Sequence, residues 1–241
     1  RYADGDKVVA ADAVVTPERT LSGHLAGVMD FDLRGDLLIS ASIDMTARAW
    51  SVSTGDVVQV FNGHRDALRC CCIWRDSLFT GSLDRTIRLW SLASGECVSV
   101  VQEHSAAVRA LITVGDSLFS ASSDTTIIEW DLACESPEDI VQMRTLHAHT
   151  DGIFALCEHD GHLYSGSADR TCKRWNLRTG KVTQEYTSRK VIELPSVVLE
   201  WLTRLPVREA LPAVCWLRPL ARVHAFYMDV VAAARPPSVH A

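Results

Sequence analysis

Several hallmarks of membrane, secreted and nucleic-acid-binding proteins are missing from this chain of 241 residues. No uncharged apolar run approaches the roughly 20 residues that span a bilayer, so we expect no membrane insertion. The first residues, Arg1 to Asp6, do not resemble a secretory signal peptide. The formal net charge is −6. Because a nucleic-acid-binding face usually requires an excess of basic residues, no nucleic-acid partner is expected.

Cysteine motifs for disulfides or zinc are also missing, although the chain has eight cysteines. No Cys-x-x-Cys pair occurs, and three of the cysteines, Cys70 to Cys72, are consecutive. Neighbouring residues on a strand face opposite ways, so these three cannot all serve one disulfide framework or one metal ion. We therefore expect reduced thiols that pack as small apolar side chains, and a protein of the cytoplasm or nucleus.

Motifs of common enzymes are absent as well. There is no Gly-x-Ser-x-Gly nucleophile elbow, no His-Glu-x-x-His metal motif and no glycine-rich phosphate-binding loop. The sequence therefore predicts a protein that is not an enzyme and has neither a metal site nor a cofactor.

What the chain does contain is a pattern of three residue types that recurs four times. In each copy a histidine is followed 20 residues later by an aspartate and 6 residues after that by a tryptophan. Successive histidines lie 40, 40 and 45 residues apart. A fixed period with constant inner spacing indicates a repeat architecture, in which such residues are typical of the frame of each unit. The four sets are His24, Asp44 and Trp50; His64, Asp84 and Trp90; His104, Asp124 and Trp130; and His149, Asp169 and Trp175.

Each repeat is predicted to form a sheet of four antiparallel strands. A short run of apolar and small residues leads to the aspartate in a tight turn, and a second β-rich run follows, which is typical of a hairpin. Another strand precedes the hairpin, and a fourth follows it, in three of the repeats after a Thr-Gly or Ser-Gly turn. The preceding strands are expected at residues 28–33, 68–73, 108–114 and 153–157.

The constant spacing also predicts a hydrogen-bond network. The histidine and the aspartate lie at the same end of the sheet, so an imidazole N–H can donate to the carboxylate. The other ring nitrogen can accept from a hydroxyl on the second strand, which in turn can accept from the indole N–H. Buried polar groups cost about 1–3 kcal/mol each when unpaired, so a complete network would hold loop, turn and strand together. The hydroxyls that we assign to this role belong to Ser42, Ser82, Ser122 and Ser167.

These residues resemble the WD-repeat (WD40) family of β-propellers. A Gly-His pair opens two repeats, at Gly23-His24 and Gly63-His64. An Asp-x-Thr turn followed by the tryptophan occurs in all four. The resemblance covers about residues 18–186. It implies an all-β fold of propeller blades, each a four-stranded antiparallel sheet.

The chain departs from the family pattern at several places. Glu103 and Ala148 replace the glycine before two histidines, and the Trp-Asp dipeptide occurs only at Trp130. Residues 132–139 lengthen the third repeat as a solvated loop; a Ser-Pro modification site within it is the alternative. Arg189 stands where a fifth histidine is expected.

Three regions follow from this pattern. Residues 1–17 are a partial strand region, residues 18–186 form the WD40 repeats, and residues 187–241 are a non-repeat extension with short helices at 196–205 and 222–234. Residues 18–21 are expected to form an outer strand whose own blade is missing. Because rings of this family more often have seven blades, the four repeats predict an incomplete or open propeller. The absent initial Met suggests a fragment or a processed chain.

The resemblance implies a non-enzymatic scaffold or adaptor that binds a protein or peptide on the face carrying the aspartate turns, here called the top face. A partner that completes the propeller is a further expectation. An alternative is the substrate-recognition part of a ubiquitin ligase or of a kinase-linked complex that binds acidic or phosphorylated peptides. The candidate partner-binding residues follow the histidines or flank the turns: Ile43, Arg65, Asp66, Leu83, Arg85, Ser123, Asp151, Ala168 and Arg170.

A catalytic alternative comes from a different class. Serine, histidine and aspartate within hydrogen-bonding reach are also the components of a hydrolase triad. The fourfold recurrence and the position of each serine on a strand argue against an exposed nucleophile, so we keep hydrolysis only as the less favoured hypothesis.

Overall fold

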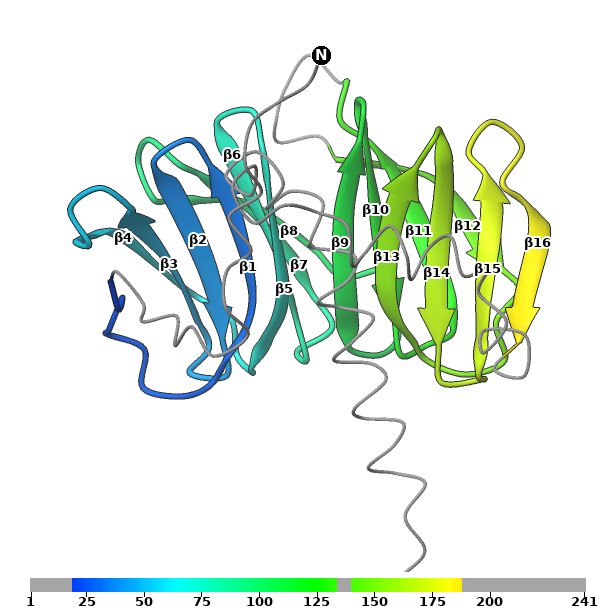
Figure 1. Ribbon diagram of the computed structural model, residues 1–241, viewed down its shortest axis with the longest axis horizontal. Helices are drawn as coiled ribbons and strands as arrows, with labels where there is room; N and C mark the ends of the chain where they lie inside the picture. Colours follow the sequence, from blue (N-terminus) through cyan, green and yellow to red (C-terminus); the bar gives the residue numbers. More distant parts are fainter. Residues whose placement is uncertain (1–18, 134–139, 188–241) are drawn as a thin grey trace, which may run out of the picture.

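The computed structural model describes residues 19–133 and 140–187, which form sixteen β-strands in four antiparallel sheets (Figure 1). We call the sheets blades 1 to 4 in chain order; within each, the strands lie side by side in sequence order. Blade 1 contains β1 (Val28–Arg34), β2 (Leu37–Ser42), β3 (Thr46–Ser51) and β4 (Val57–Asn62), and blade 2 contains β5 (Leu68–Trp74), β6 (Ser77–Ser82), β7 (Ile87–Ser91) and β8 (Cys97–Val101). Blade 3 contains β9 (Val108–Val114), β10 (Ser117–Ser122), β11 (Thr126–Asp131) and β12 (Val141–His147), and blade 4 contains β13 (Ile153–His159), β14 (His162–Ser167), β15 (Thr171–Asn176) and β16 (Lys181–Thr187).

The four-stranded blades confirm the strand pattern expected from the repeats. The second strand of each blade alternates apolar residues with small ones and is buried on both faces, as β6 and β10 are. Small side chains there let neighbouring blades approach closely. At Gly81, for example, an added Cβ would lie within 3 Å of Cys70 on its own blade and of Val108 on the next.

Three apolar clusters fill the spaces between successive blades. The first joins blade 1 to blade 2 around Phe61 and Leu78, the second joins blade 2 to blade 3 around Phe79 and Leu118, and the third joins blade 3 to blade 4 around Phe119. Most of the core therefore lies between blades, and a blade alone would leave its apolar faces in water.

The blades form an open arc, as the sequence predicts. In Figure 1 blade 1 and blade 4 lie at opposite ends of the row, and the inner strands β1, β5, β9 and β13 face its concave side. Within the described ranges no helix is present, and hence none that could cross a membrane. The predicted helices at 196–205 and 222–234, the strand region 1–17 and the loop at 134–139 lie outside the described residues.

The predicted outer strand at residues 18–21 is wrong in its described part. Residues 19–21 have no strand conformation. A strand needs a partner strand to complete its hydrogen-bond ladder, and among the described strands none pairs with this segment. Arg19 instead donates to the backbone oxygens of Val52 (3.0 Å) and Ser53 in the β3–β4 turn.

Candidate functional site

A hydrogen-bond network fixes the top of each blade. In blade 1 the His24 Nδ1 lies 2.7 Å from Asp44 Oδ2, and its Nε2 lies 2.7 Å from Ser40 Oγ. Trp50 Nε1 donates to the same hydroxyl at 2.7 Å. The carboxylate accepts at Nδ1 and the indole already donates to the hydroxyl. The Nδ1–H tautomer of the imidazole fits these contacts, because the serine hydroxyl can then donate to Nε2 while it accepts from the indole.

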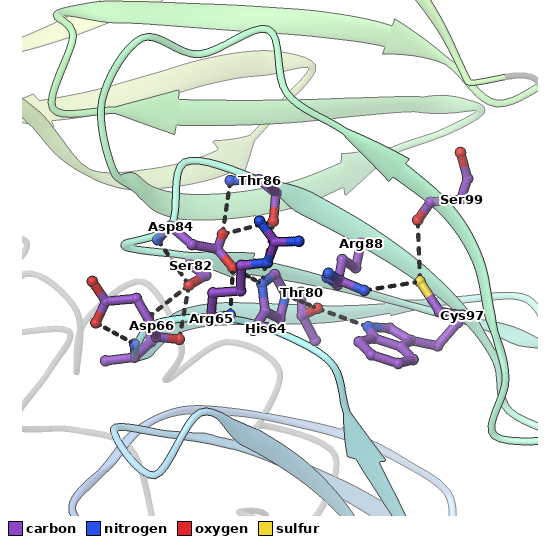
Figure 2. A network of polar contacts seen from close by, with 12 residues as sticks. His64, Arg65, Asp66, Thr80, Ser82, Asp84, Thr86, Arg88, Cys97 and Ser99 are labelled. Atoms are coloured by element: carbon purple, nitrogen blue, oxygen red, sulfur yellow. Dashed lines mark hydrogen bonds and ion pairs between the residues drawn. The ribbon is translucent and has the colours of Figure 1, made fainter.

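The same network recurs in the other three blades, with hydrogen bonds between 2.7 and 2.8 Å. Figure 2 shows it in blade 2, where His64 lies between Asp84 and the Thr80 hydroxyl. All four predicted histidines, aspartates and tryptophans take part in these networks. The hydroxyls that complete the four networks are those of Ser40, Thr80, Ser120 and Ser165.

The predicted hydroxyls Ser42, Ser82, Ser122 and Ser167 are wrong for this role. Ser42 lies at the end of β2 and accepts from the backbone N–H of Asp44 at 3.1 Å, so it caps the turn. It also donates to Ala26 O at 3.2 Å, which ties the turn to the loop after His24. The serines at the same position in the other blades make the same two contacts.

Hairpin register explains the two-residue error. The β2–β3 ladder pairs Leu38 with Trp50 and Ser40 with Arg48. Side chains on a strand alternate, so Ser40 and Ser42 share one face, and Ser40 is the hydroxyl closer to the indole.

Each aspartate accepts four hydrogen bonds from its turn and from the histidine loop. Asp169 accepts from the side chains of His149 and Thr171 and from the backbone N–H groups of Thr150 and Thr171. Burial raises the pKa of this carboxyl, but these hydrogen bonds outweigh it and bring the pKa to about 2. The same balance lowers the pKa of Asp44, Asp84 and Asp124 further. Burial lowers the pKa of His149 against the opposing effect of Asp169, which agrees with a neutral imidazole.

The four networks do not present a nucleophile. The hydroxyls of Ser40, Thr80, Ser120 and Ser165 are on residues at most 4% exposed, and each accepts a tryptophan N–H. A hydrolase would need its hydroxyl open to substrate beside an oxyanion site. Across residues 19–133 and 140–187, no group of three His, Cys, Asp or Glu side chains is arranged to hold a metal ion. The networks therefore hold the blades together and expose no reactive hydroxyl.

The top-face candidates lie on the loops and turns that this frame holds in place. The turn residue before each aspartate donates its backbone N–H to the loop after the histidine; Ile43 bonds to Gly27 O and Leu83 to Ala67 O, both at 2.9 Å. Ser123 and Ala168 make the equivalent contacts. Of the candidates, Ile43, Arg65, Asp66, Arg85, Asp151 and Arg170 are exposed, and Leu83, Ser123 and Ala168 are half-buried.

A second row of residues, which the sequence did not single out, lies on the inner strands. Each inner strand has an irregular register five residues after its histidine, where one residue is extra to the ladder. Bulges of this kind re-aim a side chain and are common near functional sites. The residues at this position, here called the inner-rim residues, are Met29, Arg69, Arg109 and Phe154. The sequence shows that these four positions lie at the same distance from their histidines, but it does not show the bulge.

The inner rim adjoins the top face. Arg109 donates from Nε to Ser123 Oγ at 2.7 Å, and its guanidinium lies 5.1 Å from the centre of the Phe154 ring. Burial and the nearby charge of Arg69 lower the pKa of Arg109 from its ordinary value. Along the described chain neither arginine has a carboxylate within ion-pair distance, so two like charges share this part of the surface.

Comparison with protein-family models identifies the family of these repeats. The family model described as "WD domain, G-beta repeat" matches residues 15–51, 55–91, 95–131 and 140–176, together more than half of the chain. The chain belongs to the WD-repeat family. Each match ends just after its tryptophan, so a sequence repeat contains the segment before the histidine and the first three strands of one blade, and a blade takes its fourth strand from the next repeat.

Curated relatives match short segments of this WD-repeat chain. The WD repeat-containing protein pop1 of Schizosaccharomyces pombe is 42% identical over 52 residues, which are 22% of this chain and 7% of the relative. Cell division control protein 4 of Saccharomyces cerevisiae is 41% identical over 51 residues, 21% and 6% of the two chains. Mitochondrial division protein 1 of the same species is 48% identical over 42 residues, 17% and 6%. The matched segments thus span less than a tenth of these relatives.

Solved structures share the fold. The computationally designed Ika8 protein superposes with a TM-score of 0.60 at 24% identity, covering 68% of this chain and 50% of that one. The designed Ika4 protein superposes with a TM-score of 0.57 at 24% identity, covering 65% of this chain and 94% of that one. At this identity the likeness concerns the fold alone.

Proposed function

We propose that this WD-repeat chain is a non-enzymatic scaffold that binds a protein or peptide across its top face and inner rim. The family supports a protein-interaction role in general, and the local geometry supports this location. The four networks hold the turns rigidly, while the side chains beside them, such as Ile43 and Arg85, remain exposed. A rigid surface that offers exposed side chains can bind a partner with little ordering cost.

The proposed class of ligand rests on the pair Arg69 and Arg109. Two guanidinium groups near each other, on residues that are both half-buried, create a local positive potential that an anionic group would stabilise. Phe154 and Met29 flank the pair on the neighbouring inner strands and offer apolar contact. We therefore propose an acidic or phosphorylated peptide with an adjoining apolar residue as the ligand, with Arg65, Arg85 and Arg170 as further cationic contacts.

Charge reversal tests this proposal. A phosphopeptide library screened against the chain should yield ligands whose affinity falls at least about tenfold in an Arg69→Glu variant and in an Arg85→Glu/Arg170→Glu double variant. Arg178, exposed beyond β15 and away from the aspartate turns, supplies the matched control, because Arg178→Glu changes the same charge elsewhere. Equal affinity of all variants, with unchanged melting temperatures, would contradict the proposed location.

A narrower role is that this surface recognises substrates for a ubiquitin ligase or a kinase-linked complex in the cytoplasm or nucleus. Its support is the basic pair together with the resemblance of the repeats to such propellers. Affinity capture from cell extract, with the Arg69→Glu variant as control, should recover ligase or kinase subunits only with the unaltered chain. Recovery of other classes of protein would contradict the ligase or kinase-linked role and remain consistent with the general scaffold role.

A further inference from the structure

We propose that Ser123 is a phosphorylation site, and that its phosphate binds the guanidinium groups of Arg109 and Arg69 and closes the inner rim to other anions. The closure adds regulation to the peptide-binding surface, and in that respect it rests on the proposed function. The modification itself and the contacts of the phosphate rest only on the geometry of blades 2 and 3.

Ser123 carries a hydroxyl at the first position of a top-face turn. Strand β10 ends at Ser122 and β11 begins at Thr126, so Ser123 lies outside both strands. It is half-buried, whereas Ser120 and Ser122 are fully buried. Its backbone N–H donates to Ala107 O at 2.9 Å, which holds the turn in place. The side chain of Ser123 thus belongs to the top face and not to the buried network of its blade.

Blade 3 differs from the other blades in what surrounds this position. Its turn residue is a serine beside an inner-rim arginine, and Arg109 Nε donates to Ser123 Oγ at 2.7 Å. Blade 2 has the equivalent arginine, Arg69, but its turn residue offers no side-chain acceptor. The residues just before the aspartate in the other three blades are Ile43, Leu83 and Ala168.

The contact with Ser123 uses one of several N–H donors on Arg109. Among the residues that the structure describes, none hydrogen-bonds the terminal nitrogens of Arg109 or the guanidinium of Arg69. A phosphate on Ser123 begins at the oxygen that Arg109 already contacts. It brings further acceptor oxygens and a charge of about −1.5 to −2, which suit the free donors of both arginines.

The neighbouring blade helps to hold Arg109 in position. The Phe154 ring centre lies 5.1 Å from its guanidinium. The loop before Phe154 approaches the turn with a glycine: a Cβ added at Gly152 would lie 3.2 Å from Ser123 Cα. Arg109 is therefore fixed by Ser123 on one side and Phe154 on the other, and a phosphate on Ser123 would bind it with little ordering cost.

The modification is a phosphoryl transfer from ATP, catalysed by a protein kinase. Ser123 Oγ forms a bond to the γ-phosphorus, the bond from this phosphorus to the β–γ bridging oxygen breaks, ADP leaves and the hydroxyl proton is released. The charge of the phosphate then offsets the two positive charges of Arg69 and Arg109. A second anion loses the potential that would attract it to the inner rim.

The contacts can be tested with phosphoserine incorporated at position 123 of the full chain. The second ionisation of phosphoserine has its midpoint near about pH 6, and phosphorus NMR should place it at least about 1 pH unit lower here, because nearby cations favour the dianion. Arg109→Gln and Arg69→Gln should each raise the midpoint. Phosphoserine at Ser94, exposed in the β7–β8 turn, supplies the control. Equal midpoints at the two positions, or a midpoint that neither arginine variant moves, would overturn the proposed contacts.

A second measurement asks whether a kinase reaches the site. The folded chain is incubated with ATP and cell extract, and its phosphorylated residues are mapped by peptide mass spectrometry. We expect phosphate on Ser123, and its loss from that peptide in Ser123→Ala. Labelling of Ser94 without Ser123, or labelling of Ser123 only after the chain is unfolded, would refute the site and leave Ser123 as a residue that positions Arg109.

Binding of inorganic pyrophosphate, followed by NMR of the arginine Nε–H groups, tests the closure. Phosphoserine at position 123 should weaken this binding at least about tenfold, and phosphoserine at position 94 should leave it unchanged. Equal affinity of the two modified chains would contradict the closure. Failure of the unmodified chain to bind pyrophosphate would contradict the closure and the anionic ligand of the proposed function together, while the phosphorus titration would still decide the contacts of the phosphate.

Discussion

At the scale of single residues, the blade frame depends on one hydroxyl per blade that both donates and accepts. Thr80 donates to His64 and accepts from Trp90, each at 2.8 Å. A hydroxyl does both through a single atom, which suits the small buried space between the two rings. The sequence identified the histidine, aspartate and tryptophan by their spacing but not this hydroxyl. Two hydroxyls on the same strand face are distinguished only by the register of the hairpin.

Substitution of Thr80 tests this role directly. Thr80→Val keeps the shape but leaves Trp90 N–H and His64 Nε2 without a partner, and should cost about 2–4 kcal/mol of unfolding free energy. Thr80→Ser keeps the hydroxyl and should cost less than about 1.5 kcal/mol. Urea unfolding at pH 7 measures both. Equal stability of the two variants would mean that the network does not stabilise the blade.

The aspartates predict how stability depends on pH. The pKa of Asp169 is about 2 in the folded chain, below its ordinary value of 3.8. Its contribution, roughly 2 kcal/mol, is therefore present at neutral pH and is lost as the pH falls from about 4 toward 2. The pKa of His149 is also lowered, from its ordinary value of 6.5, because the folded state disfavours the charged imidazole. Protonation of His149 as the pH falls below that value therefore also lowers the stability of the folded chain.

Asp169→Asn should therefore lower stability at pH 7 and have less effect at pH 3. Urea unfolding of both chains at several pH values checks this. Asp160, an exposed turn residue at the opposite end of blade 4, supplies the control Asp160→Asn. A stability difference between Asp169→Asn and the unaltered chain that stays constant from pH 7 to pH 3 would contradict the assignment.

At the scale of elements, each blade turns from its second to its third strand through a residue in the left-handed region. Met45, Arg85, Thr125 and Arg170 have φ between 67° and 74°. This conformation strains residues other than glycine and asparagine, and β-branched residues most. The sequence predicted the turn from the aspartate, but the conformation of the following residue depends on the hydrogen bonds that the aspartate accepts.

Thr125 is the β-branched member of this set, so its replacement should stabilise the chain. Thr125→Asn should raise the unfolding free energy by about 0.5–1 kcal/mol, since asparagine adopts the left-handed conformation more easily. Thr125→Val keeps the branching and should bring no gain. Thermal unfolding of the two variants under the same conditions measures the difference. A Val variant as stable as the Asn variant would contradict the proposed backbone strain at Thr125.

At the scale of the whole molecule, most of the core lies between blades. Blades 2 and 3 are packed on both sides, whereas blades 1 and 4 are each packed against one described neighbour. In repeat proteins stability is close to a sum over units and their contacts, so end units open more often than inner ones.

Hydrogen exchange should show this gradient. Backbone amides of β6 and β10 should exchange more slowly than those of β2 and β14, although all four strands hold the same position in their blades. Mass spectrometry of peptides from the four strands, in the unaltered chain at low concentration, measures the rates. Uniform protection across the four blades would indicate that the end faces are covered.

The sequence by itself determined the repeat, the four antiparallel blades and the positions of the histidines, aspartates and tryptophans. It could do so because each depends on local spacing and alternation, which recur in phase. Only the tertiary structure decided which hydroxyl joins each network, because that depends on the register between strands. It also brought Arg69 and Arg109 together through bulges on neighbouring blades. And it showed that Val28 is exposed and Tyr164 half-buried where their equivalents are buried, because burial depends on the neighbour that a blade meets.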